Sequence, residues 1–116
     1  MMSLLEFLRA RRSVRRFKPD AIPRETVEQL IAAAVAAPSA SNKQPWRFVA
    51  VTDRATIATM AAGVRAAVDR IARHIEAASE GSFRAYGTYF TRFEDAPLVL
   101  VVLSRRLTDV NQGSEQ

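Results

Sequence analysis

The sequence predicts an α+β fold, in which several helices accompany a small sheet, and three observations support this. Its 116 residues suit a single domain with one hydrophobic core. Apolar residues recur at helical spacing in four or five segments. Only two runs, at residues 48–52 and 98–103, are short and apolar throughout, as expected of strands buried on both faces.

The first helix is expected to begin at Ser3, because Ser3 and Glu6 have the spacing of a capping box. It should run into the arginines that start at Arg9, whose positive charges favour the C-terminal end of a helix. Residues 14–18 are expected to be extended, since Pro19 disfavours a helical conformation in the residue before it.

The second helix is expected to have Pro23 in its first turn and to end before Pro38. Its apolar face consists of Val27, Leu30, Ile31, Ala34 and Val35. Small and polar residues at 39–45 predict a loop ahead of the first strand, with Trp46 packed beneath it.

Asp53 is the expected cap of a third helix, which should run through about Ala62 and be interrupted by Gly63. The next helix should carry Val64, Val68, Ile71 and Ile75 on one face and should end at Gly81. A set of aromatic residues then recurs at helical spacing and is expected to pack in the core rather than to wall a ligand pocket: Phe83, Tyr86, Tyr89, Phe90 and Phe93.

Pro97 is expected to open the second strand. A sheet of two buried strands is incomplete, because a typical sheet has about four to six. Either another chain supplies the missing neighbours, or the sequence is the first part of a longer one.

The composition excludes several kinds of site. The chain has no cysteine, which rules out disulfides, thiol catalysis and cysteine-bound metals. Its one histidine, His74, cannot form a multi-histidine metal site and is expected to be partly exposed or hydrogen-bonded rather than catalytic. Redox chemistry would therefore need a bound organic cofactor. No apolar run approaches membrane-spanning length and no secretory signal is evident, so we expect a cytoplasmic protein without a membrane partner.

The densest cluster of basic residues lies near the N-terminus, between Arg9 and Lys18. The net charge is +5, and 15 of the 17 basic residues are arginines. Arg11, Arg12, Ser13 and Arg15 fall in one short segment, where guanidiniums and a hydroxyl could bind a phosphate. An ordinary solvated helix end is the alternative on charge alone.

A second segment of interest follows the second helix. In Pro38-Ser39-Ala40-Ser41-Asn42, small side chains permit a close approach of the backbone to a ligand, and Asn42 can both donate and accept hydrogen bonds. Such a loop suits the polar edge of a flavin ring. An ordinary helix-to-strand loop is the alternative.

Taken in order, these segments resemble the nitroreductase family of FMN-dependent oxidoreductases. The resemblance rests on residues 11–17 (RRSVRRF), Ile22-Pro23, residues 36–48 (AAPSASNKQPWRF) and Asp95-Ala96-Pro97. It implies that residues 1–116 are the N-terminal part of one nitroreductase-like domain, with helices around a mixed or antiparallel sheet. It also implies an intertwined homodimer with FMN at the interface.

The same resemblance implies roles for the two segments. Arg11, Arg12, Ser13 and Arg15 would hold FMN, whereas Pro38, Ser39, Ala40 and Asn42 would approach the FMN bound mainly by the partner subunit. Such enzymes pass a hydride from NADH or NADPH through the flavin to small-molecule electron acceptors such as nitroaromatics or quinones. No catalytic side chain and no metal is expected, because the flavin carries the chemistry.

Two other readings compete with this one. A small basic module could bind nucleic acid through residues 9–18, although aromatic residues are not interleaved with these arginines. Alternatively, the chain could be a non-catalytic fragment that folds only by pairing the strand at 98–103 with another chain.

Overall fold

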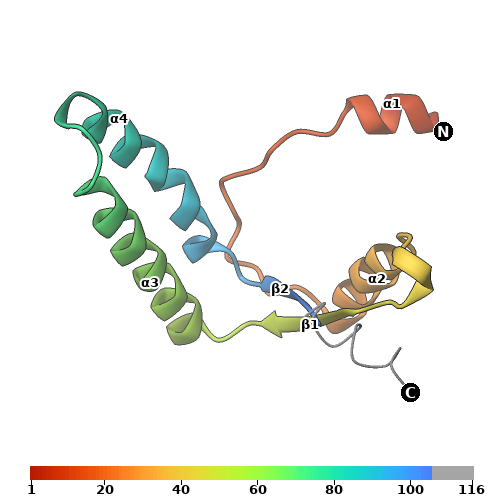
Figure 1. Cartoon of the computed structure of the whole chain (residues 1–116). Coiled ribbons are helices and arrows are strands. Elements are labelled where there is room, and N and C mark those ends of the chain that lie inside the picture. The colour runs from red at the N-terminus through yellow and green to blue at the C-terminus, as the bar shows by residue number, and fades with distance from the viewer. Residues whose placement is uncertain (106–116) are drawn as a thin grey trace, which may run out of the picture. The chain divides into compact units, whose positions relative to one another are not determined.

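The computed structural model describes residues 1–105. Figure 1 shows the elements in chain order: α1 (Leu4–Arg9), α2 (Arg24–Val35), the short 3-10 helix η1 (Ala40–Asn42), β1 (Trp46–Val51), α3 (Arg54–Ala72), α4 (Ala77–Gly87), the 3-10 helix η2 (Thr88–Asp95) and β2 (Val99–Ser104). The α+β prediction is confirmed, since helices accompany a two-stranded sheet.

The chain divides into two compact units. One unit combines residues 1–19 with residues 58–96, and the other combines, among the described residues, 20–57 with 97–105. The first unit therefore holds α1, most of α3, α4 and η2. The second holds α2, η1 and both strands.

The ends of the helices follow local chemistry. The predicted capping box is present, because the N–H of Ser3 donates to Glu6 Oε2 (2.9 Å) and the N–H of Glu6 donates to Ser3 Oγ (3.2 Å). Asp53 caps α3 as expected, accepting from the N–H and the hydroxyl of Thr56. Pro23 precedes the first turn of α2 as its cap residue, one position earlier than predicted.

Two predicted breaks are wrong. Gly63 lies inside the continuous helix α3, and Gly81 lies inside α4. Neither glycine has positive φ, so both adopt conformations that the helix can continue through. A glycine costs a helix only about 1 kcal/mol relative to alanine. The helix predicted to end at Gly81 instead ends at Ala72, before Ile75, and a new helix begins at Ala77.

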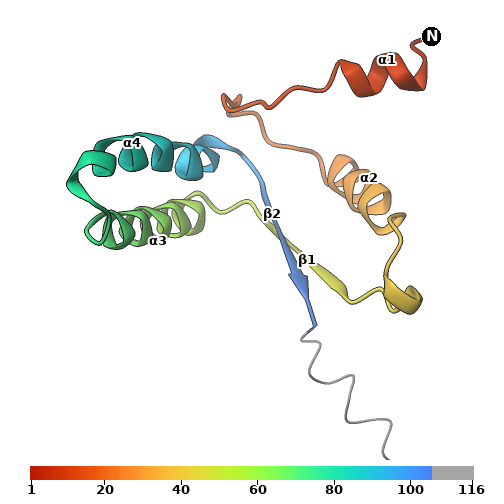
Figure 2. The same ribbon diagram turned by 45° about the horizontal axis from the view of Figure 1, so that its top comes forward.

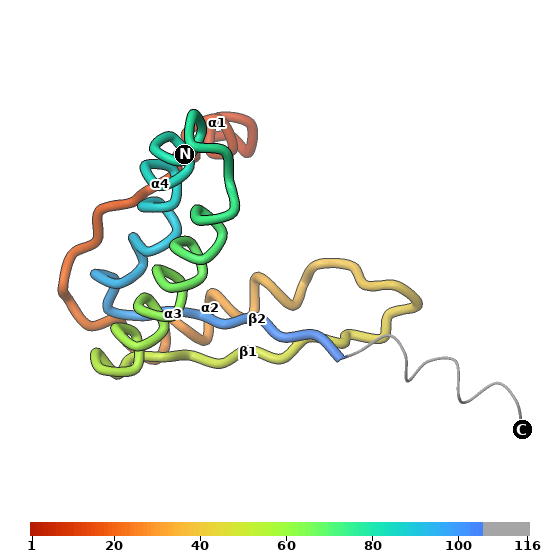
Figure 3. Tube along the Cα trace, turned by 60° about the vertical axis from the view of Figure 1, so that its left-hand side comes forward, coloured from red at the N-terminus to blue at the C-terminus, as the bar shows by residue number. Residues whose placement is uncertain are grey.

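In the first unit, α3 and α4 run side by side (Figure 3). Gly87 is buried where they meet, and a Cβ atom at this position would lie 2.6 Å from Val68 Cγ1. Arg84 of α4 donates to Asp69 of α3 across the same pair of helices (2.8 Å). A close contact and an ion pair thus join the two helices.

In the second unit, β1 and β2 form an antiparallel pair (Figure 2). In its register Trp46 is paired with Ser104, and Val51 with Val99. The predicted burial on both faces is wrong for the described chain. Val49 and Ala50 of β1 are exposed, as are the last three residues of β2. Within residues 1–105 each strand has only one neighbour, so much of the apolar sheet is uncovered.

Candidate functional site: an arginine–serine segment and a strained loop

The arginine-rich segment joins α1 to α2 without regular secondary structure. Residues 11–18 are all exposed. Within the described chain, the side chains of Arg11, Arg12 and Ser13 form no hydrogen bond or ion pair with another residue. By contrast, four arginines elsewhere each bind a carboxylate: Arg24, Arg65, Arg73 and Arg84. Guanidiniums without carboxylate partners are available to an external anion.

Arg15 is the member of this segment with a fixed position. Its guanidinium carbon lies 5.1 Å from the centre of the Tyr89 ring, and that of Arg92 lies 5.3 Å from the same ring. Both distances are within the range of a cation–π contact. A residue of η2 therefore holds one end of the arginine-rich segment inside the first unit.

Tyr89 belongs to a cluster of aromatic rings. The Tyr86 ring meets Tyr89 edge to face at 6.0 Å between centroids, and Phe90 at 5.2 Å. Tyr86 is 61% exposed, Tyr89 is 48% exposed and Phe90 is 44% exposed. The prediction that they pack in the core is therefore wrong for this part of the chain, whereas Phe83 and Phe93 are half-buried.

The loop after α2 is strained. Ser41, Asn42 and Gln44 have φ angles of 53°, 52° and 47°. Only a few per cent of non-glycine residues adopt such left-handed conformations, and asparagine tolerates them best. Three in four consecutive positions is therefore an uncommon backbone, of a kind that is concentrated at ligand-binding sites.

Hydrogen bonds within the loop hold this backbone. The Ser39 hydroxyl oxygen accepts from the N–H of Gln44 (3.0 Å), and the N–H of Asn42 donates to the carbonyl of Ser39 (3.0 Å). The amide of Gln44 donates to Asn42 Oδ1 at 3.4 Å. Ser39 is half-buried, whereas Pro38, Ala40 and Asn42 are exposed. Ser39 thus shapes the loop, and its neighbours present their surfaces to solvent.

Hydrogen bonds lower the pKa of two carboxyl groups, Asp69 and Asp53. The hydrogen bond from Arg84, together with that from Arg73, lowers the pKa of Asp69 below its usual value. The bonds from the Thr56 side chain and backbone lower the pKa of Asp53 in the same direction. Asp53 is bound within the N-terminal cap of α3, and Asp69 is bound between α3 and α4. Both carboxylates therefore stabilise helices.

His74 is exposed in the turn after α3. Among residues 1–105, no group of three or more His, Asp or Glu side chains could hold a metal ion.

A family model described as the Nitroreductase family matches residues 8–116. The chain belongs to this family. The resemblance that rested on residues 11–17 and 36–48 is thereby confirmed, and the family is one of oxidoreductases.

Several curated relatives of this nitroreductase-family chain have different names. It is 38% identical to 5,6-dimethylbenzimidazole synthase of Rhodobacter capsulatus over 90% of this chain and 50% of that protein. It is 48% identical to iodotyrosine deiodinase of Haliscomenobacter hydrossis over 41% of this chain and 22% of that protein. A putative NADH dehydrogenase/NAD(P)H nitroreductase of Archaeoglobus fulgidus is 40% identical over 52% of this chain and 34% of that protein.

Solved structures give the same fold. A BluB-like flavoprotein from Clostridium difficile 630 has a TM-score of 0.74 at 24% identity, covering 98% of this chain and 56% of that one. Oxidized iodotyrosine deiodinase bound to FMN and 3-iodo-L-tyrosine also has a TM-score of 0.74, at 26% identity over 90% of this chain and 58% of that one. The nitroreductase-family chain thus spans about half the length of relatives that match nearly all of it.

The two predicted site segments of this nitroreductase-family chain lie in different compact units. Arg11, Arg12, Ser13 and Arg15 belong to the first unit, and residues 38–42 belong to the second. Sequence reasoning missed Tyr89 as the residue over which Arg15 and Arg92 both lie. It also missed Gln44 as a member of the strained loop. The helical spacing of the aromatic residues was the available signal for Tyr89, but it was assigned to the core.

None of the helices in the described residues is both long enough and apolar enough to cross a membrane.

Proposed function

We propose that this chain forms part of an FMN-dependent oxidoreductase of nitroreductase type. In this proposal Arg11, Arg12, Ser13 and Arg15 bind FMN, with the phosphate as the main anionic target. Residues 38–40 and Asn42 approach the FMN bound mainly by a partner subunit in a homodimer. We expect the protein to work in the cytoplasm.

The observation that carries the proposal is that Arg11 and Arg12 of the arginine–serine segment have no carboxylate partner within the described chain. By contrast, Arg24 of α2, Arg65 of α3 and Arg84 of α4 each have one. An exposed phosphate group can accept forked hydrogen bonds from two such guanidiniums and one from the Ser13 hydroxyl. Arg15 of the same segment lies over the Tyr89 ring, which fixes its position.

The strained loop supports the same proposal. Its small residues Ala40 and Ser41 are exposed, and the positive φ of Asn42 takes the backbone out of a right-handed helical course. Asn42 Oδ1 accepts from Gln44 at 3.4 Å, a long bond that a ligand donor could replace. A flat ring with donors and acceptors at its edge fits these groups.

FMN, when bound, would take a hydride from NADH or NADPH and pass electrons to a nitroaromatic or quinone-type acceptor. The protein's own residues would bind and orient it, and none needs to act as a proton donor or nucleophile. That division suits a chain without cysteine and with one exposed histidine.

The proposal is tested by titrating FMN with the protein and following the loss of flavin fluorescence. Replacing Arg11→Ala together with Ser13→Ala should weaken binding by about 10- to 100-fold, since hydrogen bonds to a charged group contribute about 1.5–3 kcal/mol. Arg70→Ala is the matched control, because Arg70 is an exposed arginine of α3 outside the segment. Equal FMN affinity in the unaltered chain, the double variant and Arg70→Ala would contradict the assignment. Steeply salt-dependent binding of DNA or RNA without flavin uptake would favour the nucleic-acid alternative instead.

A second candidate activity is formation of 5,6-dimethylbenzimidazole. The observation in its favour is the 38% identity to the Rhodobacter capsulatus synthase across 90% of this chain. Incubation with FMN and NADH, followed by mass spectrometry for that product, distinguishes it from reduction of an added nitroaromatic or quinone. Formation of 5,6-dimethylbenzimidazole without reduction of the added nitroaromatic or quinone would support the synthase activity.

A further inference from the structure

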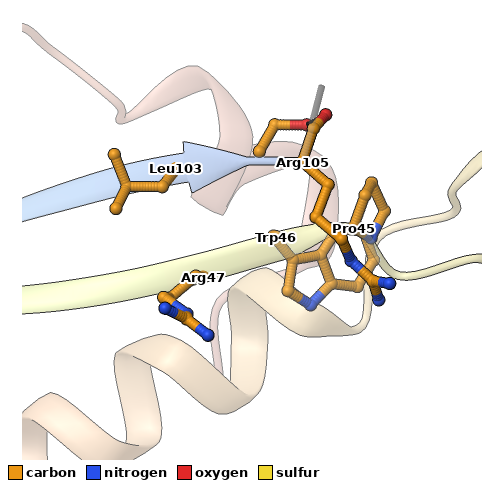
Figure 4. A pocket seen from close by; sticks show the side chains of 6 residues that line it. Pro45, Trp46, Arg47, Leu103 and Arg105 are labelled. Atoms are coloured by element: carbon orange, nitrogen blue, oxygen red, sulfur yellow. Dashed lines mark hydrogen bonds between the residues drawn. The ribbon is translucent and has the colours of Figure 1, made fainter. Parts of the chain in front are cut away.

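A hollow at the end of the two-stranded sheet has no role in the proposed flavin site. It has a volume of about 540 Å³ and is lined by Pro45, Trp46, Arg47, Leu103, Ser104 and Arg105 (Figure 4). Pockets that bind small ligands have volumes of about 300–1,000 Å³. All six residues belong to the second compact unit, so the hollow is defined within one body.

The apolar lining of the hollow includes the flat ring of Trp46. Trp46 begins β1, lies opposite Ser104 of β2, and is half-buried. The Pro45 ring precedes it, and Leu103 contributes an exposed aliphatic side chain, 45% accessible. An indole ring of this kind stacks well against another aromatic ring. The prediction that Trp46 packs beneath the loop as a core anchor is therefore only partly met, because one part of the residue faces this hollow.

Its polar part is positively charged. Arg47 and Arg105 line the hollow, and no acidic residue does within the described chain. Neither guanidinium has a hydrogen-bond or ion-pair partner among residues 1–105. The backbone N–H of Arg105 donates to the carbonyl of Pro45 (3.1 Å), which fixes the start of the Arg105 side chain beside the Trp46 end of the sheet. A pair of unpartnered guanidiniums favours an anion.

We propose that this hollow binds a planar aromatic anion, with its ring on Trp46 and its acidic group on Arg105. Arg47, which also lines the hollow, adds a second positive charge to it. This site is independent of the flavin proposal, because it shares no residue with the arginine–serine segment or with residues 38–42.

The test uses the chain's single tryptophan as a reporter. The probe is 4-nitrobenzoate, a quencher of tryptophan fluorescence, and 4-nitrobenzamide is its neutral counterpart. We expect saturable quenching by the benzoate at concentrations where the benzamide quenches only by collision. Arg105→Gln should weaken benzoate binding about tenfold, as expected for loss of a charge-assisted hydrogen bond. Arg105→Lys should recover part of the affinity.

Arg70→Gln is the matched control, since it removes one exposed arginine of the other unit and should leave the titration unchanged. The indole N–H signal of Trp46 in a nitrogen–proton NMR spectrum gives a second readout on the unaltered protein. It should shift with the benzoate and not with the benzamide. Equal effects of the two probes, or an unchanged benzoate affinity in Arg105→Gln, would overturn the proposal. None of these outcomes depends on whether FMN binds.

Discussion

Gly87 is the residue where the packing of α3 against α4 leaves no room for a side chain. A Cβ atom there would lie 2.6 Å from Val68 Cγ1, a distance that real Cβ contacts do not reach. Valine is branched at Cβ and has few alternative rotamers, so it cannot move aside easily. Gly81, six residues earlier in the same helix, has no atom within 4 Å of the corresponding position.

The two glycines of α4 should therefore respond in opposite ways to alanine. Gly87→Ala should lower the free energy of unfolding by about 1–3 kcal/mol, the usual cost of overpacking. Gly81→Ala should raise it by about 0.5–1 kcal/mol, because alanine favours the helix and finds open space. Urea denaturation followed by circular dichroism measures both changes. A stabilising Gly87→Ala would show that the helices are not packed as described.

Asp69 determines a pH dependence at the same helix pair. Hydrogen bonds from Arg84 and then Arg73 lower its pKa in the folded chain below the usual 3.8. A lowered folded pKa stabilises the fold at pH values above the unfolded pKa, and this contribution is lost as the pH falls through the folded value. Between pH 7 and 5 the contribution should be constant.

The melting temperature of the unaltered chain should thus decline below about pH 4. Asp69→Asn should melt lower at neutral pH but lose less on acidification. The decline should not vanish, since the pKa of Asp53 is lowered as well by its bonds to Thr56. Asp20→Asn, at an exposed position, is the control and should keep the slope of the unaltered chain. Parallel melting curves for Asp69→Asn and the unaltered chain would contradict the assignment.

At the scale of elements, the contact between η2 and the arginine-rich segment has a measurable consequence. The Arg15 guanidinium lies over Tyr89, and exposed cation–π contacts contribute about 0.5–1 kcal/mol. Tyr89→Leu should remove this contact and make residues 11–18 more mobile. Trypsin should then cut after Arg15 or Arg16 about two- to fivefold faster.

Phe90→Leu is the matched control for that experiment. Phe90 is adjacent in sequence and similarly exposed, but its ring meets Tyr86 rather than an arginine. Timed digestion followed by mass spectrometry should therefore show faster cleavage for Tyr89→Leu alone. The same rate in both variants would mean that Tyr89 does not hold the segment.

The elements also show which features were readable from sequence. Caps at Ser3 and Asp53 were predicted correctly because they depend on residues three positions apart. Gly63 and Gly81 were misread because a glycine penalises a helix too weakly to break it. The arginine-rich segment was identified by its charge, but its contact with Tyr89 joins residues that are distant along the chain.

The strained loop is a second feature that the sequence predicts only in part. Small and polar residues predicted a loop at 39–45, and η1 with its flanking residues confirms one. The positive φ angles of Ser41 and Gln44 could not be predicted, because neither residue type prefers that conformation. They arise from hydrogen bonds such as that from Gln44 to the Ser39 hydroxyl, which appear only once the loop is closed.

At the scale of the whole molecule, the buried core is small for the amount of apolar sequence. Among the described residues, the buried hydrophobic side chains are Ile57, Ala61, Ala72 and Ala96. Large apolar side chains stay exposed on the sheet, including Val102 at 64% and Val49 at 42%. The sequence predicts strands with apolar residues on both faces. The described chain does not supply the further strands or helices that would be needed to cover them.

The last prediction concerns association of this chain with itself, which the proposed homodimer requires. Exposed apolar strands bury surface when they pair or pack, and a valine side chain contributes about 1.5–3 kcal/mol when fully buried. We therefore expect the chain to self-associate at micromolar concentrations in sedimentation equilibrium. Val102→Lys should raise the dissociation constant at least tenfold, because a symmetric dimer contains the change twice. Gln29→Lys adds the same charge at an exposed polar position of α2 and should leave association unchanged. A monomer at every concentration, or equal association of both variants, would show that the uncovered sheet does not join two copies.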